Sequence, residues 1–72
     1  MYDIFRILRR FMMDLEEEGK SQVKFTLNRN GKWYITETKE GKEIVILSGE
    51  SLVVPTLLKS IDEYRRAKIN FQ

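Results

Sequence analysis

The sequence predicts an α+β fold in the order α-β-β-β-α, a three-stranded antiparallel meander with both helices packed on one face. Two observations carry this prediction. Apolar residues recur every three to four positions near both ends of the chain, and they alternate with polar residues in the middle, between glycine-containing turns. At 72 residues, we expect one small domain spanning residues 1–72.

The first helix is expected over about residues 2–18. Its apolar stripe would run through Ile4, Leu8, Phe11 and Leu15, and it would be widened by Met1, Phe5, Ile7 and Met12. Gly19 follows the stripe and suits the left-handed residue just past a helix end. Among the charges off this stripe, Arg10 has an acid four residues later, Asp14, whereas Arg6 and Arg9 have none.

Three strands are expected at about residues 21–28, 32–38 and 42–48. In the first of them, Val23, Phe25 and Leu27 alternate with polar residues, as in a half-buried strand. The loops between the strands are near-copies of each other, with the sequences RNGK and KEGK.

The first of these loops allows two registers. A two-residue Asn30-Gly31 turn would send Trp33 to the face opposite Leu27, whereas a three-residue loop would pair Asn28 with Lys32 and place Trp33 beside Leu27. A slip of one residue moves every side chain of a strand to the other face. We therefore favour the three-residue loop, which unites the apolar residues.

Repeating the three-residue loop at Lys39-Glu40-Gly41 would set Ile35 opposite Val45 and Trp33 opposite Leu47. Both turns would then agree on a single core face. That face would carry Val23, Phe25, Leu27, Trp33, Ile35, Val45 and Leu47.

The second helix is expected to begin between Ser51 and Pro55, because proline is tolerated only in the first turn of a helix. Its apolar stripe would run through Val54, Leu57, Leu58, Ile61 and Tyr64, with Phe71 continuing it if the helix lasts. The cations Arg65, Arg66 and Lys68 complement the dipole of a helix end, and Asp62 can pair with Arg66.

The face of the sheet away from the helices is the candidate functional surface. It would carry Gln22, Lys24, Thr26, Asn28, Lys32, Tyr34, Thr36, Thr38, Lys42, Ile44, Ile46 and Ser48. These residues include three lysines and no acid. Lysines neutralise phosphates, and an exposed aromatic ring can stack on any of the bases.

The leading hypothesis is therefore a non-catalytic module that binds nucleic acid, with a single strand favoured over a duplex. Phosphate contacts would come from Lys24, Lys32 and Lys42, stacking from Tyr34, and auxiliary contacts from Arg6, Arg9 and Arg10. A second hypothesis makes Tyr34, Ile44 and Ile46 an apolar patch for a protein partner or for a homodimer. The third alternative is an ordinary solvent-exposed face.

Two families resemble this chain in part. The α-β-β-β-α order and the length are similar to the double-stranded RNA-binding domain. The strand-turn-strand segment with Gly31-Lys32, followed by Leu47-Ser48 and a helix, resembles the transcriptional coactivators that bind single-stranded DNA on a curved sheet. Both resemblances imply nucleic acid as the partner.

The composition argues against several other classes of function. The chain contains no cysteine and no histidine, which excludes thiolate nucleophiles, histidine-based triads and zinc ribbons. Its glycines all punctuate elements, so no loop is left to cradle a cofactor phosphate. Consecutive Glu16, Glu17 and Glu18 would diverge around a helix and cannot share a metal ion. We expect no enzyme, no cofactor or metal, no small-molecule substrate, no membrane segment and a cytoplasmic location.

Overall fold

The computed structural model describes residues 3–70 and confirms the predicted order of elements. The elements are α1 (Ile4–Glu17), β1 (Lys24–Leu27), β2 (Trp33–Lys39), β3 (Lys42–Gly49) and α2 (Val54–Asn70). The strands form one antiparallel sheet in the order β1-β2-β3. Met1 and Tyr2, near the expected start of the first helix, and Phe71 lie outside the described residues.

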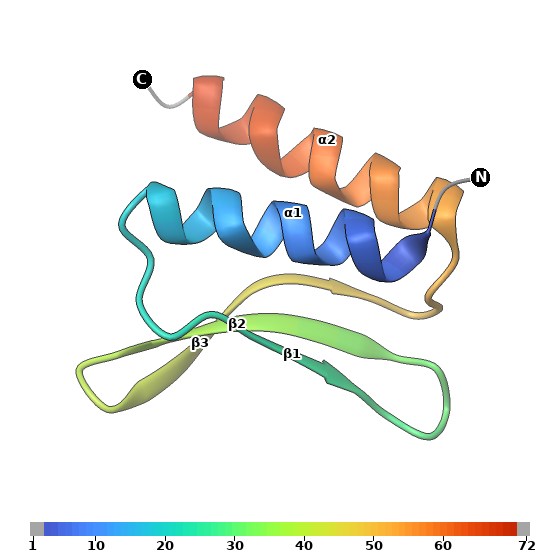
Figure 1. Cartoon of the computed structure of the whole chain (residues 1–72), viewed down its shortest axis with the longest axis horizontal. Coiled ribbons are helices and arrows are strands. Elements are labelled where there is room, and N and C mark those ends of the chain that lie inside the picture. Colours follow the sequence, from blue (N-terminus) through green and yellow to red (C-terminus); the bar gives the residue numbers. More distant parts are fainter. Residues whose placement is uncertain (1–2, 71–72) are drawn as a thin grey trace.

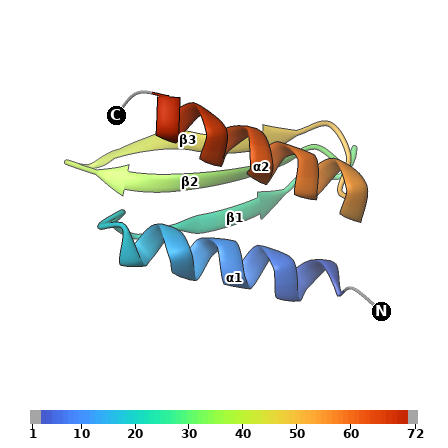
Figure 2. The ribbon, with the colours of Figure 1, turned by 90° about the horizontal axis from the view of Figure 1, so that it is seen from above.

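Both helices lie on the same side of the sheet (Figure 1). Seen from above, α1 runs beside β1 at one edge and α2 crosses over β2 and β3 (Figure 2). The two helices run in the same direction, with their first turns at the same end of the molecule. Within residues 3–70, the opposite face of the sheet is left open, as the sequence predicted (Figure 1).

Local signals set both ends of α1. The carboxylate of Asp3 accepts a hydrogen bond from the backbone N–H of Phe5 at 3.0 Å and caps the first turn. At the other end, Gly19 has a φ of 101°, and Lys20 donates its N–H to the carbonyl of Leu15 at 3.1 Å. This is a Schellman motif, and it confirms the predicted role of Gly19.

The core lies between the helices and the central strand. Its buried residues are Leu8, Phe11, Leu15, Trp33, Ile35, Leu57 and Ile61. Val23 and Phe25 are half-buried against this cluster, as expected for the inner face of the first strand, but Leu27 is exposed. The helix α2 begins at Val54 with Pro55 in its first turn, inside the predicted interval.

The first hairpin has the predicted register. Leu27 lies opposite Trp33, and Phe25 lies opposite Ile35. The N–H of Asn28 donates to the carbonyl of Lys32 at 2.8 Å, so the three residues between them form the loop. Within this loop Gly31 has a φ of 91°, which glycine adopts without strain.

The predicted register of the second hairpin is wrong. Lys39 pairs with Lys42, so the loop has only two residues, Glu40 and Gly41. Their φ angles are 53° and 79°, and two positive angles are the mark of a type I′ turn, whose twist matches that of the strands. The two loops are similar in sequence but different in structure.

A β-bulge in β3 allows the shorter turn to form while Leu47 still faces the core. Thr36 lies opposite Val45, but Ile35 lies opposite Leu47, so Ile46 is an extra residue in β3. The bulge returns Leu47 to the helix side, while Val45 points to the open face and is 55% exposed. The expected pairings of Ile35 with Val45 and of Trp33 with Leu47 do not form.

Glu40 offers a direct test of this turn. A non-glycine residue in the left-handed region is strained, and asparagine tolerates that region better than glutamate. We expect Glu40→Asn to raise the free energy of unfolding by about 0.5–1 kcal/mol, measured by urea denaturation. Glu40→Gln removes the same charge without relieving the backbone and should change little. Equal gains in both variants would attribute the effect to charge.

Candidate binding surfaces

The open face of the sheet brings together part of the predicted platform. Thr26 lies opposite Tyr34 and Lys24 lies opposite Thr36, so these four side chains share that face. The ammonium group of Lys32 lies 5.7 Å from the centroid of the Tyr34 ring, within cation–π range. Lys24, Lys32 and Tyr34 therefore lie on one surface.

The register of the second hairpin changes the charge of this face. Lys42 pairs with Lys39 and lies on the helix side of the sheet, whereas Glu43 pairs with Thr38 and joins the open face. The Nζ atom of Lys24 lies 2.7 Å from a carboxylate oxygen of Glu43. The predicted face with three lysines and no acid is therefore wrong, because Lys42 leaves it and Glu43 enters it.

The second lysine also has an acidic neighbour. The Nζ atom of Lys32 lies 3.8 Å from a carboxylate oxygen of Glu50 in the segment after β3. Each lysine of the open face is thus close to a carboxylate, which reduces its attraction for a phosphate.

The same register change separates the predicted apolar patch. Ile44 lies opposite Glu37 and points to the helix side, and Ile46 is half-buried against the core. Neither isoleucine shares the open face with Tyr34, so the expected grouping does not form. Val45 points to that face instead and is the exposed aliphatic residue of β3 there.

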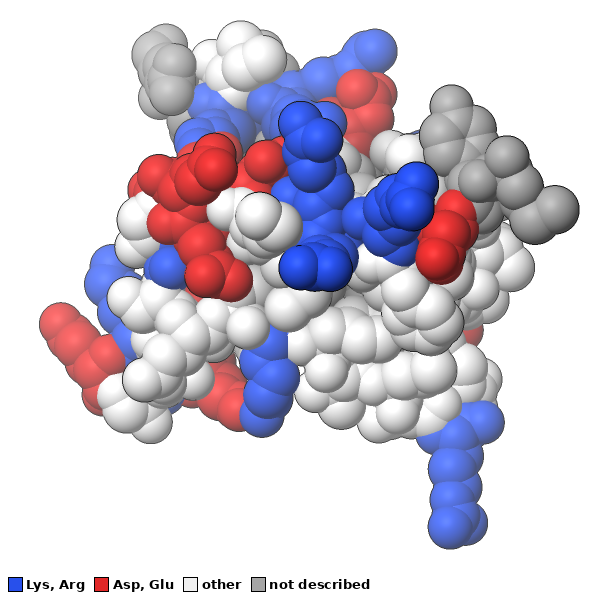
Figure 3. Space-filling view, in the orientation of Figure 1, with Lys and Arg blue, Asp and Glu red and all other residues white. Residues whose placement is uncertain are grey.

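The arginines of α1 diverge over two sides of the helix. Arg6 and Arg10 line a groove between α1 and α2, and Arg9 lines a hollow between α1 and β1. Figure 3 shows positive side chains gathered over the helices, with negative side chains beside them toward the C-terminal end of α1. These predicted auxiliary contacts therefore do not lie on the open face of the sheet.

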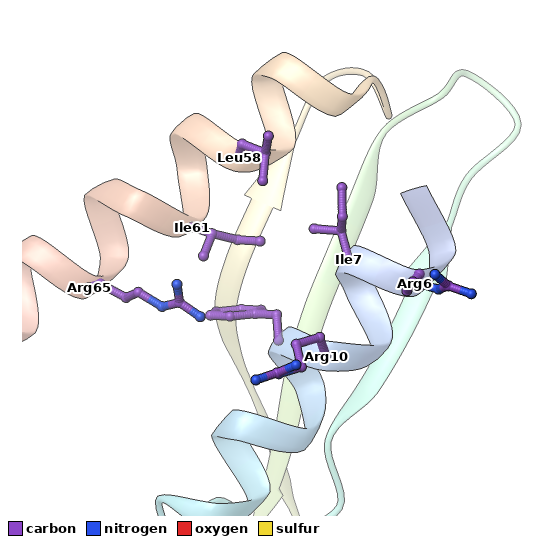
Figure 4. Close-up of a pocket in the computed structure, with 7 residues that line it drawn as sticks. Arg6, Ile7, Arg10, Leu58, Ile61 and Arg65 are labelled. Atoms are coloured by element: carbon purple, nitrogen blue, oxygen red, sulfur yellow. The ribbon is translucent and has the colours of Figure 1, made fainter. Parts of the chain in front are cut away.

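The groove between α1 and α2 is an apolar trough of about 320 Å³ with cationic edges. Its lining consists of Arg6, Ile7, Arg10, Phe11, Leu58, Ile61 and Arg65. Ile7 from α1 points across the gap toward Leu58 and Ile61 from α2 (Figure 4). Leu58 on the α2 wall is 42% exposed and is accessible from solvent, whereas Phe11 and Ile61 at the floor of the groove are buried.

Two arginines at one end of this groove share a single carboxylate. Asp14 accepts a hydrogen bond from Arg65 at 3.1 Å, and its other oxygen lies 3.9 Å from Nε of Arg10. The pairing of Arg10 with Asp14 was predicted. The pairing of Arg66 with Asp62 was also predicted, and the Nε atom of Arg66 lies 3.0 Å from a carboxylate oxygen of Asp62. With two cations on one acid, this end of the groove keeps an excess positive charge.

Arg65 is the residue of this groove that the sequence analysis missed. It was interpreted as a cation that complements the end of the second helix. In the structure it reaches across to α1, where its guanidinium lies 6.0 Å from the centroid of the Phe11 ring. Asp14 and Arg65 are 51 positions apart in the sequence, so no local pattern signals their contact.

Within residues 3–70, no three acidic side chains are placed to hold a metal ion. Of the two helices in that range, neither is long and apolar enough to cross a membrane. Comparisons with protein families, curated proteins and solved structures found no match to the chain. Function is therefore inferred from the chemistry of the surfaces.

Proposed function

We propose that the protein is a non-catalytic binding module, and that it docks a protein partner in the groove between α1 and α2. The partner segment is an amphipathic helix with a stripe of apolar side chains flanked by carboxylates. The observation that carries this proposal is the combination of an accessible apolar wall at Leu58 with Arg10 and Arg65, which share one acid.

The lining of the groove favours a protein segment over a nucleic acid. Helices bind in apolar grooves through side chains spaced three to four residues apart, and the two walls here are themselves helices. A single nucleic acid strand needs exposed rings for stacking, but Phe11, the aromatic residue of the groove, is only 2% exposed. The arginines suit carboxylates because their guanidinium groups form paired hydrogen bonds with them.

The test uses two labelled helical peptides with the same stripe of leucines, flanked by glutamates in one and by lysines in the other. Binding is measured by fluorescence anisotropy. We expect the glutamate peptide to bind about tenfold more tightly, because charge complementarity at the rim sets selectivity. Arg6→Glu/Arg10→Glu should remove that preference, and Leu58→Lys should abolish binding by placing a charge on the apolar wall.

Ile69→Lys provides the matched control, because Ile69 is also an exposed aliphatic residue of α2 but does not line the groove. It should bind the glutamate peptide like the unmodified protein. Equal affinity for the two peptides, or undiminished binding by the Leu58→Lys protein, would overturn the proposal.

Nucleic-acid binding through the open face is the second candidate function. What favours it is that Lys24, Lys32 and Tyr34 share one surface, with Lys32 close to the tyrosine ring. What weakens it is the acid beside each lysine and the position of Lys42 on the other side. A single strand would have to displace Glu43 and Glu50 from these lysines.

A labelled single-stranded oligothymidylate in the same titrations separates the two candidates. Phosphate contacts release counterions, so binding through the open face should weaken steeply as salt rises and should be lost in Lys24→Glu/Lys32→Glu. If the oligonucleotide binds in this way and the glutamate peptide does not, the second candidate replaces the first.

A further inference from the structure

A second apolar hollow lies on the other side of α1, between this helix and β1. Its volume is about 380 Å³, and it is lined by Phe5, Leu8, Arg9, Met12, Met13, Glu16 and Phe25. Figure 3 shows a broad uncharged area on this side of the molecule, from the N-terminal half of α1 to the β1–β2 hairpin. The proposed partner groove between the helices does not include it.

Large apolar side chains are exposed around this hollow. Of the residues that line it, Phe5 is 62% exposed and Met13 is 50% exposed. Leu27, two positions beyond the lining residue Phe25 on the same side of β1, is 49% exposed. Apolar residues grouped on one surface of a small domain indicate an interaction site, whereas scattered ones do not. Methionine side chains are flexible and adapt to a packed surface.

The spacing of the residues on this side of α1 suits contact with another helix. Phe5, Arg9, Met12 and Glu16 follow one another at intervals of four, three and four residues. This alternation keeps the four residues on one side of the helix, where Phe5 and Met12 are apolar and Arg9 and Glu16 are charged. Such a neighbour is absent among the described residues, because α2 packs on the other side of α1.

The two charged residues of this stripe indicate what the neighbour is. Arg9 and Glu16 are exposed, and neither forms an ion pair with another residue in the range 3–70. They are separated by two helical turns, about 10.5 Å, which is too far for a contact within one helix. In an antiparallel pair of identical helices, however, each arginine would face the glutamate of the other copy.

We propose that the protein forms a homodimer in which α1 packs antiparallel against α1 of a second copy. The twofold axis passes between Met12 and Met13, so that Arg9 of each chain faces Glu16 of the other. The interface is isologous, because one patch supplies both the cation and the anion. An arginine and a glutamate on one patch make that patch complementary in charge to a second copy of itself. The surface is limited to one helix and a hairpin, so association is expected in the micromolar range.

The dimer is tested by exchanging the charges at positions 9 and 16. Sedimentation equilibrium over a concentration series measures the affinity of self-association of each variant. Arg9→Glu and Glu16→Arg should each weaken self-association roughly tenfold, because each sets like charges against each other at two symmetric positions. An equimolar mixture of the two variants should regain the native affinity. In the mixed dimer, the glutamate introduced at position 9 of one chain faces the arginine introduced at position 16 of the other chain. The native Glu16 of the first chain faces the native Arg9 of the second.

Neither exchange should harm the fold. Both positions are exposed and outside the ion pairs of the described residues, and a base in the last turn of α1 complements the helix dipole, so circular dichroism of each variant should match that of the native protein. Val45→Asp is the control, because Val45 is an exposed apolar residue on the outer strand β3, where a sheet could also pair with a second copy. It should leave the dimer unchanged.

Several results would overturn the proposal. These are a monomeric native protein at all concentrations, a mixture that associates no better than either variant, and dissociation by Val45→Asp, which would place the interface at β3. The partner groove is tested with other substitutions, at Arg6, Arg10 and Leu58, so the outcome here is independent of that experiment.

Discussion

Replacing Trp33 by alanine is expected to remove a large part of the stability of the fold. Trp33 is fully buried on the central strand β2, its Nε1–H donates to the carbonyl of Ser51 at 2.8 Å, and its ring lies 6.3 Å from that of Phe25. Truncating a buried tryptophan costs about 3–5 kcal/mol. A chain of this size has a total stability of about 4–11 kcal/mol.

Urea denaturation followed by far-ultraviolet circular dichroism measures this loss, because Trp33 is the only tryptophan and its fluorescence disappears with it. Trp33→Phe is the matched variant, since it keeps an aromatic ring and gives up the hydrogen bond to Ser51. It should cost about 1–2 kcal/mol. A Trp33→Ala protein within about 1 kcal/mol of the native stability would show that the indole does not hold the helices to the sheet.

Replacing Gly49 by alanine is expected to cost about 2–3 kcal/mol. Gly49 lies opposite Trp33 across the β2–β3 ladder, and a Cβ atom there would stand 2.5 Å from Nε1 and 2.6 Å from Cε2 of the indole. Because Trp33 is fully enclosed, the ring has no space into which to move. Gly49 has no positive φ, so the expected cost comes from this contact and not from the backbone.

A double-mutant cycle identifies the source of that cost. Gly49→Ala should be much less costly in a Trp33→Phe background, because the smaller ring removes the atoms that the new methyl group meets. Ser48→Ala, at the neighbouring exposed position, should stay within about 0.5 kcal/mol of the native protein. An equal cost of Gly49→Ala in both backgrounds would rule out the clash.

The two turns show how far local sequence predicts a register. At Asn30-Gly31 the apolar residues on both sides favoured one loop length, and the structure has it. At Glu40-Gly41 the same reasoning was wrong, because it treated the strand as regular. The bulge at Ile46 supplies the missing residue, so a short turn and a united core coexist.

The candidate site was predicted less well than the fold. Lys24, Lys32 and Tyr34 lie together as expected, because the first hairpin was correct. Lys42 and Ile44 lie on the opposite face, because the second hairpin is shifted by one residue, and each such shift exchanges the faces. The groove at Arg65 depends on the packing of one helix against the other, which no pattern within either helix specifies.

The sequence by itself determined the order of the elements, their approximate bounds, the end of α1 at Gly19 and the first hairpin. These features follow from periodicity and turn residues, whose physical effects extend over a few neighbouring positions. Only the tertiary structure decided the bulge in β3, the charge of the open face and the meeting of Asp14 with Arg65. Each of these features depends on how the helices and the sheet pack together in one core. That packing is determined by contacts between residues far apart in the chain, which local sequence patterns do not specify.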